Sequence, residues 1–233
     1  MPSKNNSLPP DNGDFRQSIT WRIFRIMAEF VDGFQFLAGF KKTVSIFGSH
    51  ALKSDSPYYQ QAYQLGKLLG KAGFTVITGG GPGIMEAVNK GALEAGTNSV
   101  GLNIYLPPPQ GERKNPYLNK SLSFHYFFTR KVMFTFSAQA YVFFPGGYGT
   151  LDEFTEMLGL IQTKKIKRIP IILIGKDFWL PFIDWIKNDI LKQNLIEPED
   201  INLFLIVDTA EEAYEIIRRT PERHESLDRY ILY

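Results

Sequence analysis

The sequence of 233 residues contains no cysteine and only three histidines, His50, His125 and His224. Without cysteine the chain has neither a disulfide nor a thiol nucleophile. The three histidines lie too far apart in the chain to give the ligand spacing of a zinc site. The sequence therefore predicts a protein that needs no metal, and any catalysis must use other residue types.

The sequence also lacks a strong net charge and a long hydrophobic run. Its 26 basic and 24 acidic residues give a net charge of +2, without a basic run that interleaves aromatic residues. Nucleic acid is therefore not an expected partner, whereas a phosphate-sized anion is. No apolar stretch reaches the roughly 20 residues of a membrane span, and residues 1–14 are polar and lack a signal-peptide core. We expect a cytoplasmic protein with no membrane contact and a disordered tail at residues 1–14.

Residues 15–40 predict an N-terminal helical segment. Eight bulky apolar residues recur there at helical spacing: Ile19, Ile23, Ile26, Met27, Phe30, Val31, Phe34 and Leu37. We expect this stripe to pack on the body of the protein or on a partner. A helix that lies on a membrane surface is the alternative, but such helices carry a polar face rich in lysine and arginine, which this segment lacks.

Residues 41–233 have the pattern of one α/β domain with a parallel sheet, and nothing in the composition requires a second core. Helical patterns separate most of six short apolar runs, which are residues 44–47, 74–78, 100–106, 140–144, 169–174 and 205–207. The first of these helices is expected to begin at Pro57 after Ser56 and to close at Gly73. The last is expected to open with the capping pair Thr209 and Glu212.

Loops rich in small residues follow three of the predicted strands, at residues 48–50, 79–83 and 145–150. Ligands of parallel sheets bind beyond the carboxyl ends of the strands, so the three loops predict one pocket. The second loop is no dinucleotide fingerprint, because Ile84 stands where glycine or alanine is needed, and no Gly-Lys-Ser/Thr completes a P-loop. NAD and Mg-ATP chemistry are therefore disfavoured.

The stretch from Phe144 to Glu153 (FPGGYGTLDE) is the most informative part of the chain. An apolar strand gives way to three glycines, and helical periodicity begins at Leu151. Glycines allow a ligand to approach the backbone closely, and the free N–H groups of a new helix favour a phosphate. A carboxylate, Glu153, lies one turn inside the helix, and beside a bound phosphate we expect it to point to the part of the ligand where the chemistry takes place. The structural alternative is a capping box, with Thr150 as the N-cap and Glu153 reaching back to its N–H group.

Segment 121–151 contains only two formally charged residues, Arg130 and Lys131, and they lie among aromatic side chains. Cations in an apolar neighbourhood need anionic partners or a path to water. Binding of an anionic ligand is one interpretation of this pair. A structural salt bridge or a side chain that snorkels to the surface is the other.

Three motifs carry a family resemblance: residues 79–86 (GGGPGIME), residues 128–133 (FTRKVM) and residues 145–153 (PGGYGTLDE). Together they resemble the LOG (LONELY GUY) family of cytokinin riboside 5′-monophosphate phosphoribohydrolases, long mislabelled lysine decarboxylases. The resemblance runs from about residue 43 to residue 217, and the leading helix is similar to that of the longer bacterial members. It implies a Rossmann-like fold, which is a doubly wound, mostly parallel sheet with helices on both faces. It also implies a homodimer or a larger assembly of dimers.

The resemblance further implies a hydrolase without a cofactor, which cleaves an adenine-type nucleoside 5′-monophosphate to free base and ribose 5-phosphate. Arg130 and Glu153 match the catalytic pair of the family. We expect the Glu153 carboxylate to stabilise oxocarbenium charge at C1′ and to orient or deprotonate water. Arg130 stays protonated, so it is expected to bind the phosphate or to fix Glu153. The residues that match the phosphate cradle and its surroundings are Gly48, Ser49, Gly80, Gly81, Met85, Gly146, Gly147, Gly149 and Thr150, with Lys131 assisting the anion.

Glu86 departs from the family pattern, because shorter plant-type members have glycine at this position, and we expect its side chain to alter the base or ribose pocket. Two other functions remain open from the sequence. A general AMP nucleosidase would use the same residues, and a non-catalytic nucleotide carrier would use the same cradle with little need for Glu153. Lysine decarboxylation is disfavoured, because the strand-end loops hold no lysine to bind pyridoxal phosphate.

Overall fold

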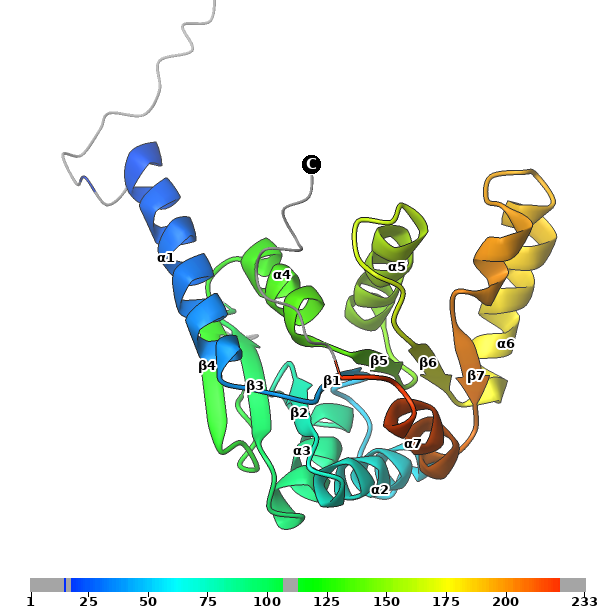
Figure 1. The fold of residues 1–233 in the computed structure, drawn as a ribbon, viewed down its shortest axis with the longest axis horizontal. Helices are drawn as coiled ribbons and strands as arrows, with labels where there is room; N and C mark the ends of the chain where they lie inside the picture. The colour runs from blue at the N-terminus through cyan, green and yellow to red at the C-terminus, as the bar shows by residue number, and fades with distance from the viewer. Residues whose placement is uncertain (1–14, 16–17, 107–112, 223–233) are drawn as a thin grey trace, which may run out of the picture.

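The fold is built on a seven-stranded sheet (Figure 1). The computed structural model describes residues 15, 18–106 and 113–222, so the tail predicted at residues 1–14 lies outside the described residues. The strands lie in the order β4-β3-β2-β1-β5-β6-β7, and every pairing between them is parallel. Their bounds are β1 Thr43–Phe47, β2 Thr75–Thr78, β3 Ser99–Ile104, β4 Lys120–Phe124, β5 Ala140–Phe143, β6 Ile171–Ile174 and β7 Leu205–Val207. The expected parallel α/β sheet is confirmed.

Helices cover both faces of this sheet (Figure 1). One face carries α2 (Pro57–Lys71), α3 (Ile84–Glu94) and α7 (Ala210–Arg218). The other face carries α1 (Ile19–Ala38), α4 (Phe127–Ser137), α5 (Tyr148–Gln162) and α6 (Lys176–Trp185). A π-helix, η2 (Ile186–Leu191), continues α6, and a 3₁₀ helix, η3 (Pro198–Asn202), precedes β7. The doubly wound, Rossmann-like arrangement is therefore confirmed.

Each face of the sheet has its own hydrophobic core, because successive side chains of a strand point to opposite faces. In β5, Ala140 and Val142 join the core under α2, α3 and α7. Tyr141 and Phe143 join the core under α1, α4, α5 and α6. All four side chains are fully buried. A sheet covered on both faces produces continuous apolar runs, which is why six of the seven strands are visible in the sequence.

Strand β4 was not expected from the sequence. It lies at the edge of the sheet, and its sequence KSLSF has only two apolar residues. The predicted ends of helices agree better with the structure. Helix α2 begins at Pro57 and is followed by Gly73 at a φ of 76°. Thr209 and Glu212 form the expected capping box at the start of α7.

Helices α2 and α3 cross closely because each has a glycine at the contact. A Cβ atom on Gly66 of α2 would collide with the carbonyl oxygen of Val88 on α3. A Cβ atom on Gly91 of α3 would likewise collide with the carbonyl oxygen of Tyr63 on α2. The backbones of the two helices therefore lie so close together that no residue larger than glycine fits at position 66 or 91.

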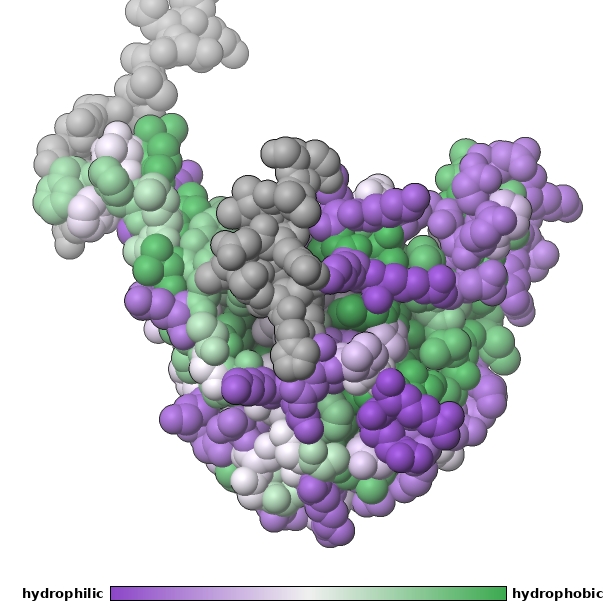
Figure 2. Space-filling model, in the orientation of Figure 1, coloured by the Kyte–Doolittle hydropathy of each residue, from purple (hydrophilic) through white to green (hydrophobic). Residues whose placement is uncertain are grey.

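Helix α1 lies within the segment where a helix was expected, and it packs on the body along part of its apolar stripe. Leu37 is buried, and a Cβ atom on Gly33 would collide with the sulfur of Met133 on α4. Phe30 and Phe34 also pack against the core. Other members of the stripe are exposed, and Figure 2 shows apolar side chains gathered along α1. Its members that are more than half exposed are Ile19, Ile23, Met27 and Val31. Within the described residues, no helix has the length and hydrophobicity to cross a membrane.

Candidate functional site

The three glycine-containing loops meet where the strand order reverses, between β1 and β5. The Ser49 N–H group, just after β1, donates to the carbonyl oxygen of Pro145, after β5, at 3.0 Å. The Ser49 carbonyl oxygen accepts from the Ile84 N–H group, at the start of α3, at 3.0 Å. Ser49 therefore joins the other two loops at the carboxyl edge of the sheet, where ligands of doubly wound folds bind.

A cavity of about 520 Å³ opens at this edge. The predicted site residues that line it are Gly48, Ser49, Met85, Arg130, Gly147, Gly149, Thr150 and Glu153. The sequence did not single out six further lining residues, which are Phe47, His50, Gly79, Phe127, Tyr148 and Asp152. A signal existed for Phe127, because it lies one helical turn before Arg130 and so shares a face of α4 with it. His50 and Asp152 fall inside the loops and motifs, but nothing in their spacing distinguishes them.

Two of the predicted cradle glycines, Gly80 and Gly81, face buried amides instead of the cavity. The Asn115 backbone N–H group donates to the Gly80 carbonyl oxygen, and its side-chain amide donates to the Gly81 carbonyl oxygen, both at 2.9 Å. Gly80 has a φ of 75°, and a Cβ atom there would lie 2.6 Å from the Asn103 amide nitrogen. These glycines shape the loop after β2 and do not line the cavity.

Glu86, the departure from the family pattern, also lies outside the cavity lining. It is in the first turn of α3, and its carboxylate accepts a hydrogen bond of 3.4 Å from the Tyr59 hydroxyl on α2. Burial and then the nearby Glu86 charge raise the pKa of Tyr59 to about 12. The Glu86 side chain is thus directed to the crossing of α2 and α3, and not to the pocket that we expected it to alter.

Helix α5 begins three residues earlier than the capping-box interpretation requires. Its N-cap is Gly147, and the Thr150 N–H group is already bonded to the Gly147 carbonyl oxygen at 3.0 Å. The capping box of Thr150 and Glu153 is therefore wrong. Thr150 instead packs against Gly146, where a Cβ atom would collide with the Thr150 hydroxyl. Gly146 thus supports the loop without lining the cavity.

Gly147 and Gly149, by contrast, have open space beside them. A Cβ atom on either glycine would meet no protein atom within 4 Å. Gly147 has a φ of −92°, which a residue with a side chain also adopts. Neither protein packing nor backbone strain therefore requires glycine at these positions. The start of α5 instead presents unobstructed N–H groups and the positive end of the helix dipole to the cavity, which suits an anion.

Glu153 is a buried carboxylate at the wall of this cavity. Glu153 is 6% exposed, and the Oε2 atom of its carboxylate has no hydrogen-bond partner among the described residues. Burial raises its pKa from 4.5 to about 7, although Arg130 and Lys131 oppose the rise. Buried carboxyl groups normally have hydrogen-bond partners, so an unsatisfied oxygen at a cavity wall needs an explanation. A group with this pKa is poised to exchange a proton near neutral pH.

Arg130 and Lys131 are adjacent in α4 but have different surroundings. The Arg130 guanidinium lies 5.4 Å from the Phe134 ring centroid and fills the space left open by Gly79, where a Cβ atom would be 3.2 Å from it. Lys131 forms ion pairs with Asp152 at 2.9 Å and Glu156 at 3.0 Å. Lys131 therefore joins α4 to α5 through a salt bridge, and only Arg130 of the two lines the cavity.

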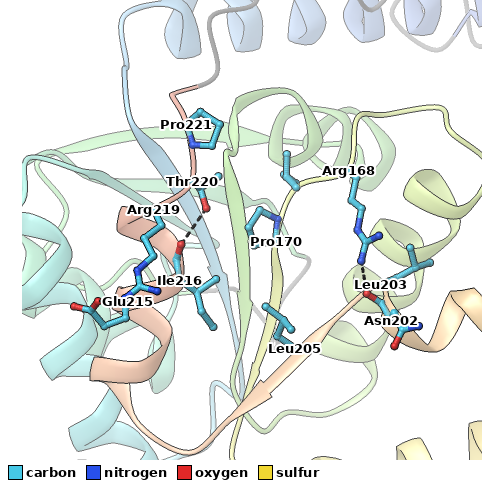
Figure 3. A pocket seen from close by; sticks show the side chains of 11 residues that line it. Arg168, Pro170, Asn202, Leu203, Leu205, Glu215, Ile216, Arg219, Thr220 and Pro221 are labelled. Atoms are coloured by element: carbon cyan, nitrogen blue, oxygen red, sulfur yellow. Dashed lines mark hydrogen bonds and ion pairs between the residues drawn. The ribbon is translucent and has the colours of Figure 1, made fainter.

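A second cavity, of about 560 Å³, lies at the opposite edge of the sheet (Figure 3). Pro170 precedes β6 and Leu205 begins β7, so the cavity is at the amino ends of the strands. Arg168 on its wall donates to the carbonyl oxygen of Asn202. Glu215 is paired with Arg219 at 3.3 Å. No predicted site residue lies here, and the ligand-binding edge of a parallel sheet is the other one.

Several known proteins are similar to this chain. The profile of a family described as "possible lysine decarboxylase" matches residues 85–217. The pyrimidine/purine nucleotide 5′-monophosphate nucleosidase of Escherichia coli strain K12 is 30% identical over 145 residues, which are 57% of this chain and 30% of the enzyme. The cytokinin riboside 5′-monophosphate phosphoribohydrolase LOG of Oryza sativa subsp. japonica is 27% identical over 147 residues, 62% of this chain and 60% of that protein. The chain thus spans less than two thirds of either relative.

A solved structure has the same fold. The molybdenum cofactor binding protein from the phototrophic bacterium Rippkaea orientalis matches 76% of this chain and 96% of its own with a TM-score of 0.55. At 24% sequence identity this likeness concerns the fold alone.

Proposed function

Because the chain belongs to the LOG-type family, whose profile is described as "possible lysine decarboxylase", we propose that it hydrolyses the N-glycosidic bond of nucleoside 5′-monophosphates. The products are free base and ribose 5-phosphate. The observation that carries the proposal is the buried Glu153 carboxylate, which shares a cavity with Arg130 and the open start of α5. Two relatives are named for activities on nucleoside monophosphates, which agrees with this chemistry. As the finer proposal, the base is of the adenine type, including cytokinins, and AMP itself is the alternative substrate.

In this mechanism the phosphate binds at the start of α5. Gly147 and Gly149 leave room for it, and the free N–H groups of the first turn donate to its oxygens. Arg130, which lines the same cavity, adds a permanent positive charge, since a guanidinium stays protonated. The phosphate thereby fixes the ribose so that C1′ faces the interior of the cavity, where Glu153 lies.

Glu153 acts on the glycosidic bond itself. Cleavage between C1′ and the base nitrogen develops positive charge on the ribose, and an ionised carboxylate close to C1′ stabilises it. The same carboxylate accepts a proton from the attacking water. A pKa of about 7 suits this role, because a general base is most effective when its pKa is near the working pH. The free Oε2 is available for the water or the ribose.

The described residues do not fit lysine decarboxylation through pyridoxal phosphate. That cofactor is held as a Schiff base by a lysine amine. No lysine is among the described residues that line the cavity. Lys131, the nearest in sequence to the site, is engaged by Asp152 and Glu156. The name of the family profile therefore finds no support in the chemistry of this site.

The proposed enzyme is a homodimer, or an assembly of dimers, that uses the exposed apolar face of α1. Side chains of this face that are more than half exposed include Ile19, Ile23 and Met27. Contiguous apolar surface of this kind typically marks an interaction site in a soluble protein. Light scattering of the pure protein at micromolar concentration tests the assembly, and a monomeric mass would contradict it. The cytoplasmic location stays a prediction.

The decisive experiment incubates the pure protein, without added metal or cofactor, with AMP and with N6-isopentenyladenosine monophosphate. Free base and ribose 5-phosphate are followed by chromatography, and Glu153→Gln is the control. We expect release by the wild type and a loss of about 100- to 10,000-fold in the variant, the usual contribution of a positioned base. Release at the parental rate in Glu153→Gln would refute the role of Glu153. Binding of both nucleotides without release would instead identify a carrier.

A further inference from the structure

Helix α4, which carries Arg130 to the cavity, begins without a cap of its own. Its N-cap residue, Tyr126, makes no side-chain capping bond, and no acidic residue is in its first turn. Its two charged residues, Arg130 and Lys131, are cations in the N-terminal half of the helix, where the positive end of the helix dipole disfavours them. The N–H groups at such a helix start favour a negative group that another element of the fold contributes.

Glu29 of α1 supplies this negative group. Its Oε1 accepts from the His125 backbone N–H group at 2.7 Å, and the His125 ring Nδ1 lies 3.1 Å from the same oxygen. Its Oε2 accepts from the Thr129 hydroxyl at 2.6 Å and from the Tyr126 backbone N–H group at 3.4 Å. Only 13% of the Glu29 side chain is exposed. Both oxygens of a nearly buried carboxylate are thus committed to the start of α4.

The packing of α1 on α4 holds Glu29 in this place. One turn after Glu29, Gly33 lies against Met133, and a side chain at position 33 would collide with the methionine sulfur. The Phe34 ring meets the Phe136 ring edge to face, with 4.8 Å between centroids. These contacts lie along the length of α4, so the two helices have one fixed register and the carboxylate one fixed position.

We propose that Glu29 is a positioning residue, which caps α4 from the neighbouring helix and thereby holds Arg130 in the cavity. Phe127 and Arg130, which line the cavity, are the first and fourth residues of α4. Fraying of the turn that Glu29 caps therefore displaces both. The kinetic consequences rest on the proposed hydrolysis, whereas the cap itself does not. The family profile covers residues 85–217 and so assigns nothing to α1.

The kinetic test compares Glu29→Ala with Glu29→Gln and with Asp32→Ala. Asp32 is exposed on the same helix and controls for the loss of one negative charge. We expect Glu29→Ala to lower kcat by about 10- to 100-fold, the scale of an error of about 1 Å in positioning. Glu29→Gln keeps one oxygen that accepts hydrogen bonds and should restore part of the rate. Asp32→Ala should match the wild type.

The pH–rate profile separates positioning from simple destabilisation. Burial raises the pKa of Glu153, Arg130 is the largest opposing influence, followed by Lys131, and Glu156 and Asp152 raise it further. When Arg130 moves away, this pKa rises. The acid limb of the profile should therefore shift to higher pH in Glu29→Ala and stay in place in Asp32→Ala. A variant that melts at a lower temperature but keeps the parental acid limb and kcat would overturn the proposal.

Amide hydrogen exchange tests the cap without reference to activity. The backbone amides of His125 and Tyr126 donate directly to Glu29 and should lose protection in Glu29→Ala. The same amides should stay protected in Asp32→Ala, and the amides of α7 should be unchanged in both variants. Retained protection in folded Glu29→Ala would refute the cap. If the wild type cleaves no nucleotide, the proposed function fails, and this exchange experiment still decides the role of Glu29.

Discussion

Replacing Glu153 with glutamine should make the protein more stable in alkaline solution. Burial, opposed in part by Arg130 and Lys131, raises the pKa of Glu153 from 4.5 to about 7. The folded protein therefore binds a proton at this carboxylate more tightly than the unfolded chain does. It follows that the free energy of unfolding falls as the pH rises from about 4.5 to about 7, and that the whole loss is present above that range.

The size of the effect follows from the two pKa values. They differ by about 2.5 (about 7 minus 4.5), and each pKa unit corresponds to about 1.4 kcal/mol. Ionisation of the buried carboxylate thus costs about 3 kcal/mol at pH 8. Glutamine does not ionise, so Glu153→Gln should exceed the wild type by about 3 kcal/mol at pH 8 and by less than about 1 kcal/mol at pH 5. At pH 8 this corresponds to a rise of about 6–12 °C in Tm for a chain of this length.

Urea titrations at pH 5, 6, 7 and 8, followed by circular dichroism, measure this difference. The difference in free energy of unfolding between Glu153→Gln and the wild type should increase from pH 5 to pH 8. Glu199→Gln, which changes an exposed carboxylate of η3, is the control and should stay within about 0.5 kcal/mol of the wild type. A difference in free energy of unfolding that is the same at pH 5 and pH 8 would refute the raised pKa of Glu153. Glu153 would then not be a base suited to neutral pH.

Three further substitutions distinguish residues that we expect to affect ligand binding from residues that we expect to affect only stability. Gly149→Ala meets open space and should keep or raise stability, by up to about 1 kcal/mol, but weaken nucleotide binding in calorimetry because its methyl group narrows the cavity. Gly66→Ala presses a methyl group on the Val88 carbonyl and should lower the free energy of unfolding by about 1–3 kcal/mol in urea titrations. Thr209→Ala removes the α7 cap and should cost about 1 kcal/mol in thermal melts, with hydrolysis unchanged. Unimpaired binding by Gly149→Ala, an undisturbed fold in Gly66→Ala or an inactive Thr209→Ala would contradict these assignments.

Most of the sheet is predictable from the sequence, because strands buried on both faces consist mainly of apolar residues. Residues 140–144 illustrate this, since alternate side chains enter two different cores and no polar position interrupts the run. Strand β4 is not predictable in this way. At the edge of the sheet Lys120 and Ser121 reach solvent, so the strand has no apolar run to recognise. Its existence depends on pairing with β3, which is a tertiary property.

The candidate site is predictable to the level of loops but not of individual side chains. Loops after β1, β2 and β5 must meet, because the carboxyl ends of parallel strands share one edge. Whether a glycine in such a loop faces a ligand or a neighbouring amide depends on residues distant in sequence. Gly80 faces Asn103, whereas Gly149 faces open space. In the sequence, however, both are glycines of a glycine-rich loop that follows a strand. The helix start at Gly147 is a similar case, since Thr150 and Glu153 have the spacing of a cap that the structure does not use.

The pairing of β1 with β5 also determines when the cavity forms during folding. Strand β1 pairs with β2 through Thr43 and Thr75, but with β5 through Val44 and Ala140, which are nearly one hundred residues apart. Closing the longer loop costs more chain entropy, and such distant contacts form slowly. The contacts among β1, β2, α2 and α3 thus close shorter loops than the contacts between β1 and β5 do. We expect refolding protein to recover ligand binding only in its last kinetic phase, when β5 docks beside β1 and brings the start of α5 to the loops after β1 and β2.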